Sequence, residues 1–106
     1  MGLRWATDEG APFFETVDAA GAPVRVVRNL RPASVRLEAE RSLRRLGVEV
    51  LDLVQAHWPD PSTPVEDTCG ALAALVRDGL ARAVGVSNFD VPLLERAEAA
   101  LRAEGV

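Results

Sequence analysis

The sequence predicts an α/β fold with parallel strands, of which the chain holds only a part. From residue 32 onward, helical and strand patterns alternate in the order helix, strand, helix, strand, helix. Such alternation, with connections of a few residues, is typical of parallel strands joined by right-handed crossovers. Parallel sheets are covered on both faces or closed into a barrel. Because only two clear strands and a stub at each end are present, we expect these residues to belong to a larger sheet or barrel.

Composition indicates a globular protein and excludes several functions. Of the 106 residues, 48% are hydrophobic and 26% are charged, so a packed core is expected rather than disorder. A net charge of -4 supplies no basic surface for nucleic acid. No apolar stretch reaches the roughly 18 residues of a membrane span, and the first residues do not resemble a signal peptide. The single cysteine, Cys69, cannot form an internal disulfide, which favours a cytoplasmic location.

The first thirty residues are rich in turns and irregular. Two β-prone runs, Phe13–Val17 and Val24–Val27, are separated by Asp18–Pro23, which predicts a small hairpin. We therefore expect one unit, residues 1–106, made of a loop and hairpin segment (1–30) followed by αβαβα units (31–106).

The first helix is expected to begin near Pro32, because proline suits the first helical position. It should end before Gly47, after two arginines that complement the helix dipole. Apolar residues at spacings of four, four and three define its buried face: Val35, Ala39, Leu43 and Leu46. The next apolar run, Val48–Val54, has the length of a strand.

Thr63–Glu66 matches a capping box with proline at the first helical position, which predicts where the second helix begins. Gly79 should end this helix. Its expected buried stripe is Val65, Cys69, Leu72, Leu75 and Val76.

A second buried strand is expected at Ala81–Val86, followed by a turn at Ser87–Asp90. A third helix ends at Gly105, and Val106 is expected to begin another strand. The apolar residues of this helix are Leu93, Leu94, Ala97 and Leu101.

Two strand ends carry the candidate functional groups, since βα folds gather such groups where strands lead into helices. The first holds His57 and Trp58, and the second holds Ser87 and Asn88. Alternation along the first strand places His57 at its tip.

Each candidate also has a structural interpretation. His57 can be a hydrogen-bonded structural residue, Ser87 and Asn88 can cap the following helix, and Trp58 can pack a loop. Cys69 falls on an apolar stripe, which favours a core residue over a nucleophile. One histidine and one cysteine cannot complete a metal site, so we expect no metal.

Several motifs resemble the aldo-keto reductase family in order and spacing. They are Ser42–Gly47 (SLRRLG), Asp52–Leu53, His57–Asp60 (HWPD), Thr63–Thr68, Leu75–Gly79 and Gly85–Phe89 (GVSNF). Gly2–Trp5 further resembles the stretch after the third strand of that family. The resemblance runs from about residue 29 to the end and, taken as a set, is highly specific.

This resemblance implies a (β/α)8 barrel that reduces aldehydes and ketones with NADPH. By the same resemblance, His57 matches the active-site histidine that orients and polarises the substrate carbonyl. Ser87 and Asn88 match the pair that binds the nicotinamide carboxamide, and Trp58 would line the substrate pocket. Physically, hydride transfer needs a ring held against a carbonyl with a donor ready at the developing oxyanion.

The chain departs from the family in its proton donor. The family uses a tyrosine assisted by a lysine and an aspartate, but this sequence contains no tyrosine and no lysine. Met1 stands about where the lysine would fall. Because a (β/α)8 barrel needs at least about 200 residues, we interpret the chain as an internal fragment around strands three to five, inactive alone.

Two other interpretations remain open at the level of sequence. A partial barrel can be a non-enzymatic assembly module that associates through uncovered strand edges. The chain can also be a gene remnant without a selected function. The intact apolar periodicities and helix caps count against this interpretation, because mutations accumulated over a long time would have erased them. The sequence fixes neither the carbonyl substrate nor the choice between NADPH and NADH.

Overall fold

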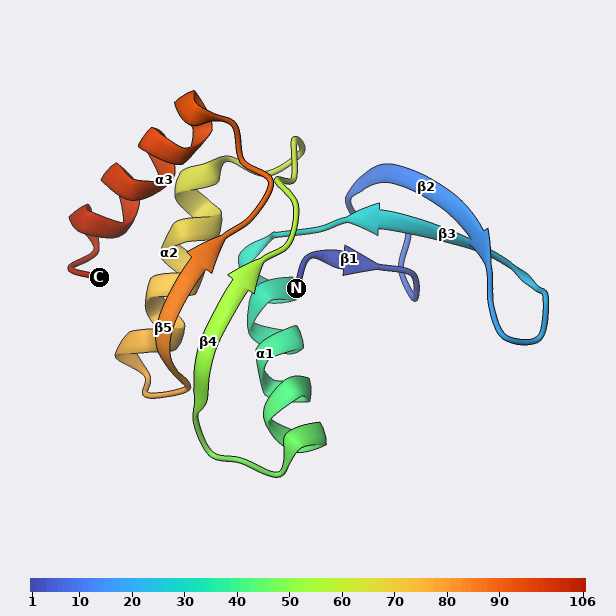
Figure 1. Ribbon diagram of the computed structural model, residues 1–106, viewed down its shortest axis with the longest axis horizontal. Helices are drawn as coiled ribbons and strands as arrows, with labels where there is room; N and C mark the ends of the chain where they lie inside the picture. Colours follow the sequence, from blue (N-terminus) through green and yellow to red (C-terminus); the bar gives the residue numbers. More distant parts are fainter.

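The computed structural model describes residues 1–106 as a wedge with a projecting hairpin, 44 × 35 × 19 Å in extent (Figure 1). Antiparallel strands β1, β2 and β3 form one sheet, and parallel strands β4 and β5 form another. The elements are β1 (Leu3–Arg4), β2 (Ala11–Val17), β3 (Pro23–Arg28), α1 (Pro32–Leu46), β4 (Leu51–Ala56), α2 (Val65–Arg77), β5 (Ala81–Val86) and α3 (Val91–Ala103). The predicted alternation of helix and parallel strand is therefore confirmed.

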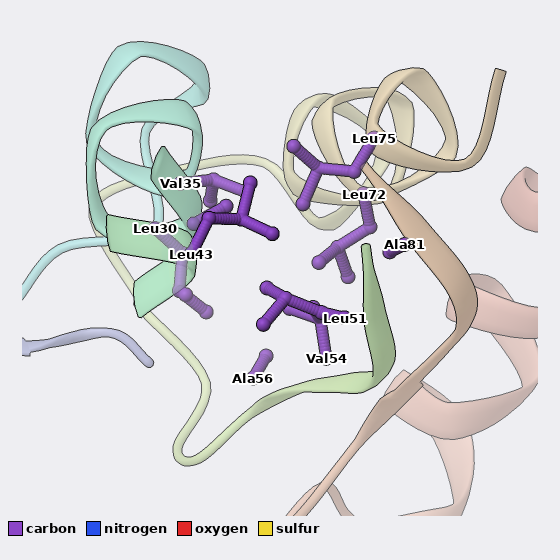
Figure 2. Packing of buried hydrophobic residues seen from close by; sticks show 10 residues of the cluster. Leu30, Val35, Leu43, Leu51, Val54, Ala56, Leu72, Leu75 and Ala81 are labelled. Atoms are coloured by element: carbon purple, nitrogen blue, oxygen red, sulfur yellow. The ribbon is translucent and has the colours of Figure 1, made fainter. Parts of the chain in front are cut away.

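The main core lies between one face of the β4–β5 pair and helices α1 and α2 (Figure 2). It consists of Leu30, Val35, Ala39, Leu43, Leu51, Val54, Ala56, Leu72, Leu75 and Ala81. Leucines buried in this way each stabilise the fold by about 1.5–3 kcal/mol relative to exposure. The opposite face of the same strands is open: Leu53 is 55% exposed, and Gln55 is exposed beside it.

Helix α1 begins at Pro32 and ends before Gly47, whose φ of 67° is the left-handed conformation expected of a glycine after a helix. The expectation that Leu46 is buried is wrong, because this side chain is 67% exposed. Leu46 is the last residue of the helix, directly before Gly47 turns the chain. The following strand lies later than the predicted 48–54, since pairing with β5 sets its ends at Leu51 and Ala56.

The capping box predicted for α2 does not form. The residue that caps the helix is Pro64, and no side chain caps its first turn. The Thr63 hydroxyl instead donates to Asp60 Oδ2 at 2.8 Å. Of the predicted stripe, four members are buried, whereas Val76 is only half-buried. The start of the helix is nonetheless close to the predicted position.

Helix α3 is less covered than its pattern predicts. Only Ala97 is buried, while Leu93 and Leu101 are half-buried and Leu94 is exposed. The reason is that α3 packs against α2 on one side only, so its other apolar side has no neighbour within this chain. Asp90 caps the helix by accepting a hydrogen bond from the Leu93 N–H at 2.9 Å, so Ser87 and Asn88 are not its caps.

The predicted hairpin is confirmed as β2 and β3, which pair antiparallel with Thr16 opposite Val24. Asp18 Oδ1 organises the turn by accepting the N–H groups of Ala20 and Ala22, each at 2.9 Å. Sequence patterns did not predict β1, which adds a third strand alongside β3.

The chain's first residue pairs with the free edge of β4. Met1 N donates to Gln55 O at 2.9 Å, and His57 N donates to Met1 O at the same distance. These two bonds flank Ala56 in the pattern of a parallel ladder. Met1 therefore occupies one position of a neighbouring parallel strand, as expected of a strand stub. None of the helices has the length and apolarity needed to cross a membrane.

Candidate active site

The four candidate residues lie together at the carboxyl ends of β4 and β5. Parallel register places Ala56 opposite Val86, so His57 and Ser87 follow side by side. The Ser87 N–H donates to Ala56 O at 2.8 Å. The Asn88 amide then joins the two strand ends, because Nδ2 donates to His57 O at 2.7 Å and to Ser87 Oγ at 3.2 Å.

Asn88 has a backbone conformation that matches this bridging. Its φ of 61° makes it the one residue other than glycine with a positive φ. Asparagine tolerates the left-handed region better than most residues, at a modest cost in energy. A strained residue held in place by two side-chain hydrogen bonds is a common feature of binding sites.

The imidazole of His57 is exposed on the open face of the sheet and makes no hydrogen bond within the chain. Its ring centroid lies 6.2 Å from that of the half-buried Trp58. Gln55 lies one step earlier on the same face, across from Gly85. The Gln55 side chain lies over Gly85, where an added Cβ would be 3.4 Å from Gln55 Nε2, whereas Ala83 is exposed.

Asp60 fastens the loop that follows β4. It is 5% exposed and accepts hydrogen bonds from Leu30 N (2.9 Å), from Ser62 N and Oγ (2.8 and 2.6 Å) and from the Thr63 hydroxyl. Burial by itself raises the pKa of Asp60, but the hydrogen bonds from Ser62, Leu30 and Thr63 outweigh it and hold the pKa below its usual value. The carboxylate thus fixes the loop next to His57 while staying ionised.

A hollow of about 630 Å³ lies beside this site rather than over it. Its walls include Arg28, the loop 59–64, Phe89 and Arg96, but none of the four candidate residues. Arg96 is already paired, since its Nη2 lies 2.8 and 2.9 Å from the two carboxylate oxygens of Glu66. The candidate residues face the open side of the sheet instead.

Cys69 is a core residue. It is fully buried with Val65 and Ala97, and burial followed by the nearby Glu66 charge raises the pKa of its thiol. A thiol with a raised pKa is a poor nucleophile. No group of three or more histidine, cysteine, aspartate or glutamate side chains lies close enough together to hold a metal ion.

Comparison with known proteins places the chain in a family. The profile of the Aldo/keto reductase family matches residues 20–106. The chain belongs to the aldo/keto reductase family. The Bacillus subtilis aldo-keto reductase YhdN is 39% identical over 71 residues, which are 67% of this chain and 22% of YhdN. The NADH-specific methylglyoxal reductase of Escherichia coli K12 is 38% identical over 69 residues, 62% of this chain and 21% of that protein.

Among solved structures, the glycerol dehydrogenase AKR11B4 from Gluconobacter oxydans superposes with a TM-score of 0.78 and 39% identity. The match covers 94% of this chain and 27% of the dehydrogenase. The expected fold is therefore confirmed: the chain is part of an aldo/keto reductase (β/α)8 barrel. It spans about a fifth to a quarter of the length of these relatives.

Two residues next to the candidate site were missed by sequence reasoning. Asp60 entered the sequence analysis only as part of a motif, although an aspartate two and three residues before a serine and a threonine is a turn signal that indicates such hydrogen bonds. Phe13, whose ring centroid lies 5.4 Å from that of Trp58, carried no signal beyond its β propensity. Its position depends on a contact across 45 residues of chain.

Proposed function

We propose that the chain supplies the central βα units of a reductase that transfers a hydride from NADPH to an aldehyde or ketone. His57 orients the substrate carbonyl, Ser87 and Asn88 hold the cofactor carboxamide, and Trp58 lines the substrate pocket. One observation carries the proposal: the Asn88 amide binds the His57 carbonyl oxygen at 2.7 Å, which ties the cofactor-binding and carbonyl-binding residues into one unit.

The free polar atoms of this unit fit a carboxamide. Asn88 Nδ2 is used by His57 and Ser87, which leaves Asn88 Oδ1 as an acceptor and the Ser87 hydroxyl as a donor. A carboxamide offers one carbonyl acceptor and one N–H₂ donor group, the complementary pair. The same amide dipoles would fix which face of the nicotinamide ring points to the substrate.

The cofactor, when bound, supplies the hydride. His57 then donates a hydrogen bond to the substrate oxygen, where negative charge develops as the hydride reaches the carbonyl carbon. Trp58 excludes water from that oxygen. A proton completes the alcohol.

The family resemblance assigns the proton to a tyrosine assisted by a lysine, and these 106 residues include neither. Loss of a general acid costs about 10²- to 10⁴-fold in rate. We therefore propose that the chain is catalytically inactive by itself and works as part of a complete barrel.

The choice of NADPH rests on the family resemblance alone. One similar protein is an NADH-specific methylglyoxal reductase, so NADH is the alternative cofactor. Parallel kinetics with the two cofactors decide between them. We also retain a cytoplasmic location as a proposal, which the single buried thiol of Cys69 favours.

The test uses the complete reductase that contains this chain, with methylglyoxal as substrate because a similar protein is named for reducing it. Loss of NADPH absorbance should show turnover, and His57→Ala should lower kcat about 10²- to 10⁴-fold. Ser87→Ala should mainly raise the KM for NADPH. Unchanged thermal unfolding of both variants is the control. An active His57→Ala enzyme, or a wild type without turnover, contradicts the proposal.

A second candidate function is favoured by the open face of the sheet. Leu53 on this face is 55% exposed, Leu94 of α3 and the last residue, Val106, are 47% and 40% exposed, and β5 has one unpaired edge. Such edges and apolar surfaces promote association. Light scattering after size exclusion tests an assembly role: a defined dimer of the 106-residue chain supports it, and polydisperse aggregate opposes it.

A further inference from the structure

The hairpin contains an irregularity at Phe13. Pro12 pairs with Val27 and Phe14 with Val26, so Phe13 is an extra residue in β2. A bulge of this kind bends the strand and turns one side chain away from the regular alternation. Bulges are also over-represented next to active sites.

The bulge brings the Phe13 ring to the candidate active site. Its centroid lies 5.4 Å from that of Trp58, with the ring planes inclined at 50°. Trp58 in turn adjoins His57. On the hairpin side, the Arg28 guanidinium carbon lies 4.7 Å from the Phe13 ring centroid.

Arg28 appears in no ion pair of the chain, and its Nε is buried without a hydrogen-bond partner. The attraction of a cation to an aromatic face is therefore its main polar contact. Phe13 is thus held between Arg28 and Trp58, while 36% of its surface stays exposed. A ring fixed at two points with one part open can contact a ligand without having to be ordered first.

We infer that Phe13 is a specificity-determining residue, which together with Trp58 forms an aromatic wall beside His57 for a flat apolar group attached to the reacting carbonyl. This inference rests on the proposed function and deepens it. Two rings inclined at 50° offer a face and an edge to a planar group, the arrangement that aromatic pairs prefer. A small aliphatic aldehyde would not reach this wall and would gain little from it.

The test compares two substrates in the complete reductase: benzaldehyde, which has a flat ring on the carbonyl, and methylglyoxal, which has none. Phe13→Ala should lower the ratio of kcat/KM for benzaldehyde over methylglyoxal about tenfold, mainly through the KM for benzaldehyde. Phe13→Tyr keeps the ring and should restore the ratio. Val17→Ala, on the same strand but remote from Trp58, is the matched control and should leave the ratio unchanged.

A role limited to packing the hairpin would lower kcat/KM for both substrates alike, and that result, or an unchanged ratio, overturns the inference. A binding measurement separates it from the proposed function. In the complete reductase, calorimetric titration should give an affinity for benzamide about tenfold weaker after Phe13→Ala than in the wild type. If this difference is seen without any turnover, the reductase proposal fails and the aromatic wall stands. If the wild type and Phe13→Ala bind benzamide equally well, the aromatic wall is overturned, whether or not the enzyme shows turnover.

Discussion

The two faces of the β4–β5 pair differ in what they contribute. One face carries Val54 and Ala56 into the core against α1 and α2, where both are buried. The other carries Leu53, Gln55 and His57, all exposed. Strand alternation thus separates stability from chemistry residue by residue. The residues proposed to act on substrate lie on the face that is exposed in this chain and faces the interior of a complete (β/α)8 barrel.

The largest effect expected from this difference is at the helix-covered face. Leu72 is fully buried, so Leu72→Ala should lower the free energy of unfolding by about 2–5 kcal/mol. In the 106-residue chain, Leu53→Ala removes the same atoms from the open face and should change the free energy of unfolding by about 0.5 kcal/mol or less. Urea unfolding followed by circular dichroism measures both. Equal losses would mean that the open face is covered, for example by a second copy.

The next effect concerns the loop between the two faces. Asp60→Ala leaves the buried Leu30 N–H without its acceptor and should cost about 1–3 kcal/mol in the same urea experiment. Ser62→Ala removes one of several donors to Asp60 and is the matched control, with a smaller loss. An Asp60→Ala loss no greater than that of Ser62→Ala would contradict this role.

Asp60 also makes the free energy of unfolding depend on pH, and its contribution decreases in acid. Its pKa is lowered in the folded chain, so its contribution is complete above the unfolded value of about 3.8 and is lost as the pH falls through the lower, folded value. The difference in stability between wild type and Asp60→Asn should therefore be constant near neutrality and shrink below about pH 4. Urea midpoints at a series of pH values check this, and a difference that grows in acid would contradict it.

A smaller effect is expected on the open face from the backbone of Asn88. Because its φ is 61°, Asn88→Ala should be about 1 kcal/mol less stable than Asn88→Gly, although both lose the bond to His57 O. The comparison of the two variants isolates backbone strain from the lost amide. Equal stabilities would show that the left-handed conformation is not retained.

The smallest effect is expected at the exposed ion pair between Asp52 and Arg82, whose atoms lie 3.6 Å apart. Asp52→Asn should change the free energy of unfolding by less than about 0.5 kcal/mol, because water and salt screen such pairs. Thermal melts in low and high salt measure it. A salt-dependent loss above about 1 kcal/mol would mean that this edge of the sheet is less exposed than described.

Features governed by local chemistry were predictable from sequence. Pro32 and Gly47 mark the ends of α1, and the bounds of β5 match the predicted Ala81–Val86. The proximity of His57 to Ser87 and Asn88 also followed, because carboxyl ends of adjacent parallel strands meet at one edge. Each of these depends on backbone geometry or on the polarity pattern of one segment.

Features that depend on a choice between alternative hydrogen bonds, or on contacts with residues far away in the sequence, were not predictable. Thr63 had the sequence of a helix cap, but Pro64 occupies the cap position, and the Thr63 hydroxyl donates to Asp60 Oδ2 instead. Leu46 and Leu94 follow the helical period, yet burial needs a neighbour that this chain does not supply. The bulge at Phe13 depends on how β2 pairs with β3 and on contact with Trp58, which no local pattern encodes.

The peptide groups on both sides of the His57 α-carbon are fastened to segments far away in the sequence. The His57 N–H is bound by the Met1 carbonyl, and the His57 carbonyl by the Asn88 amide. A single amide proton therefore reports on the assembly of three segments, and its hydrogen exchange with solvent would be slow only while Met1 stays docked against β4. Deuterium uptake at this one amide would thus report when Met1 docks against β4 beside the candidate site, and the measurement needs no substrate.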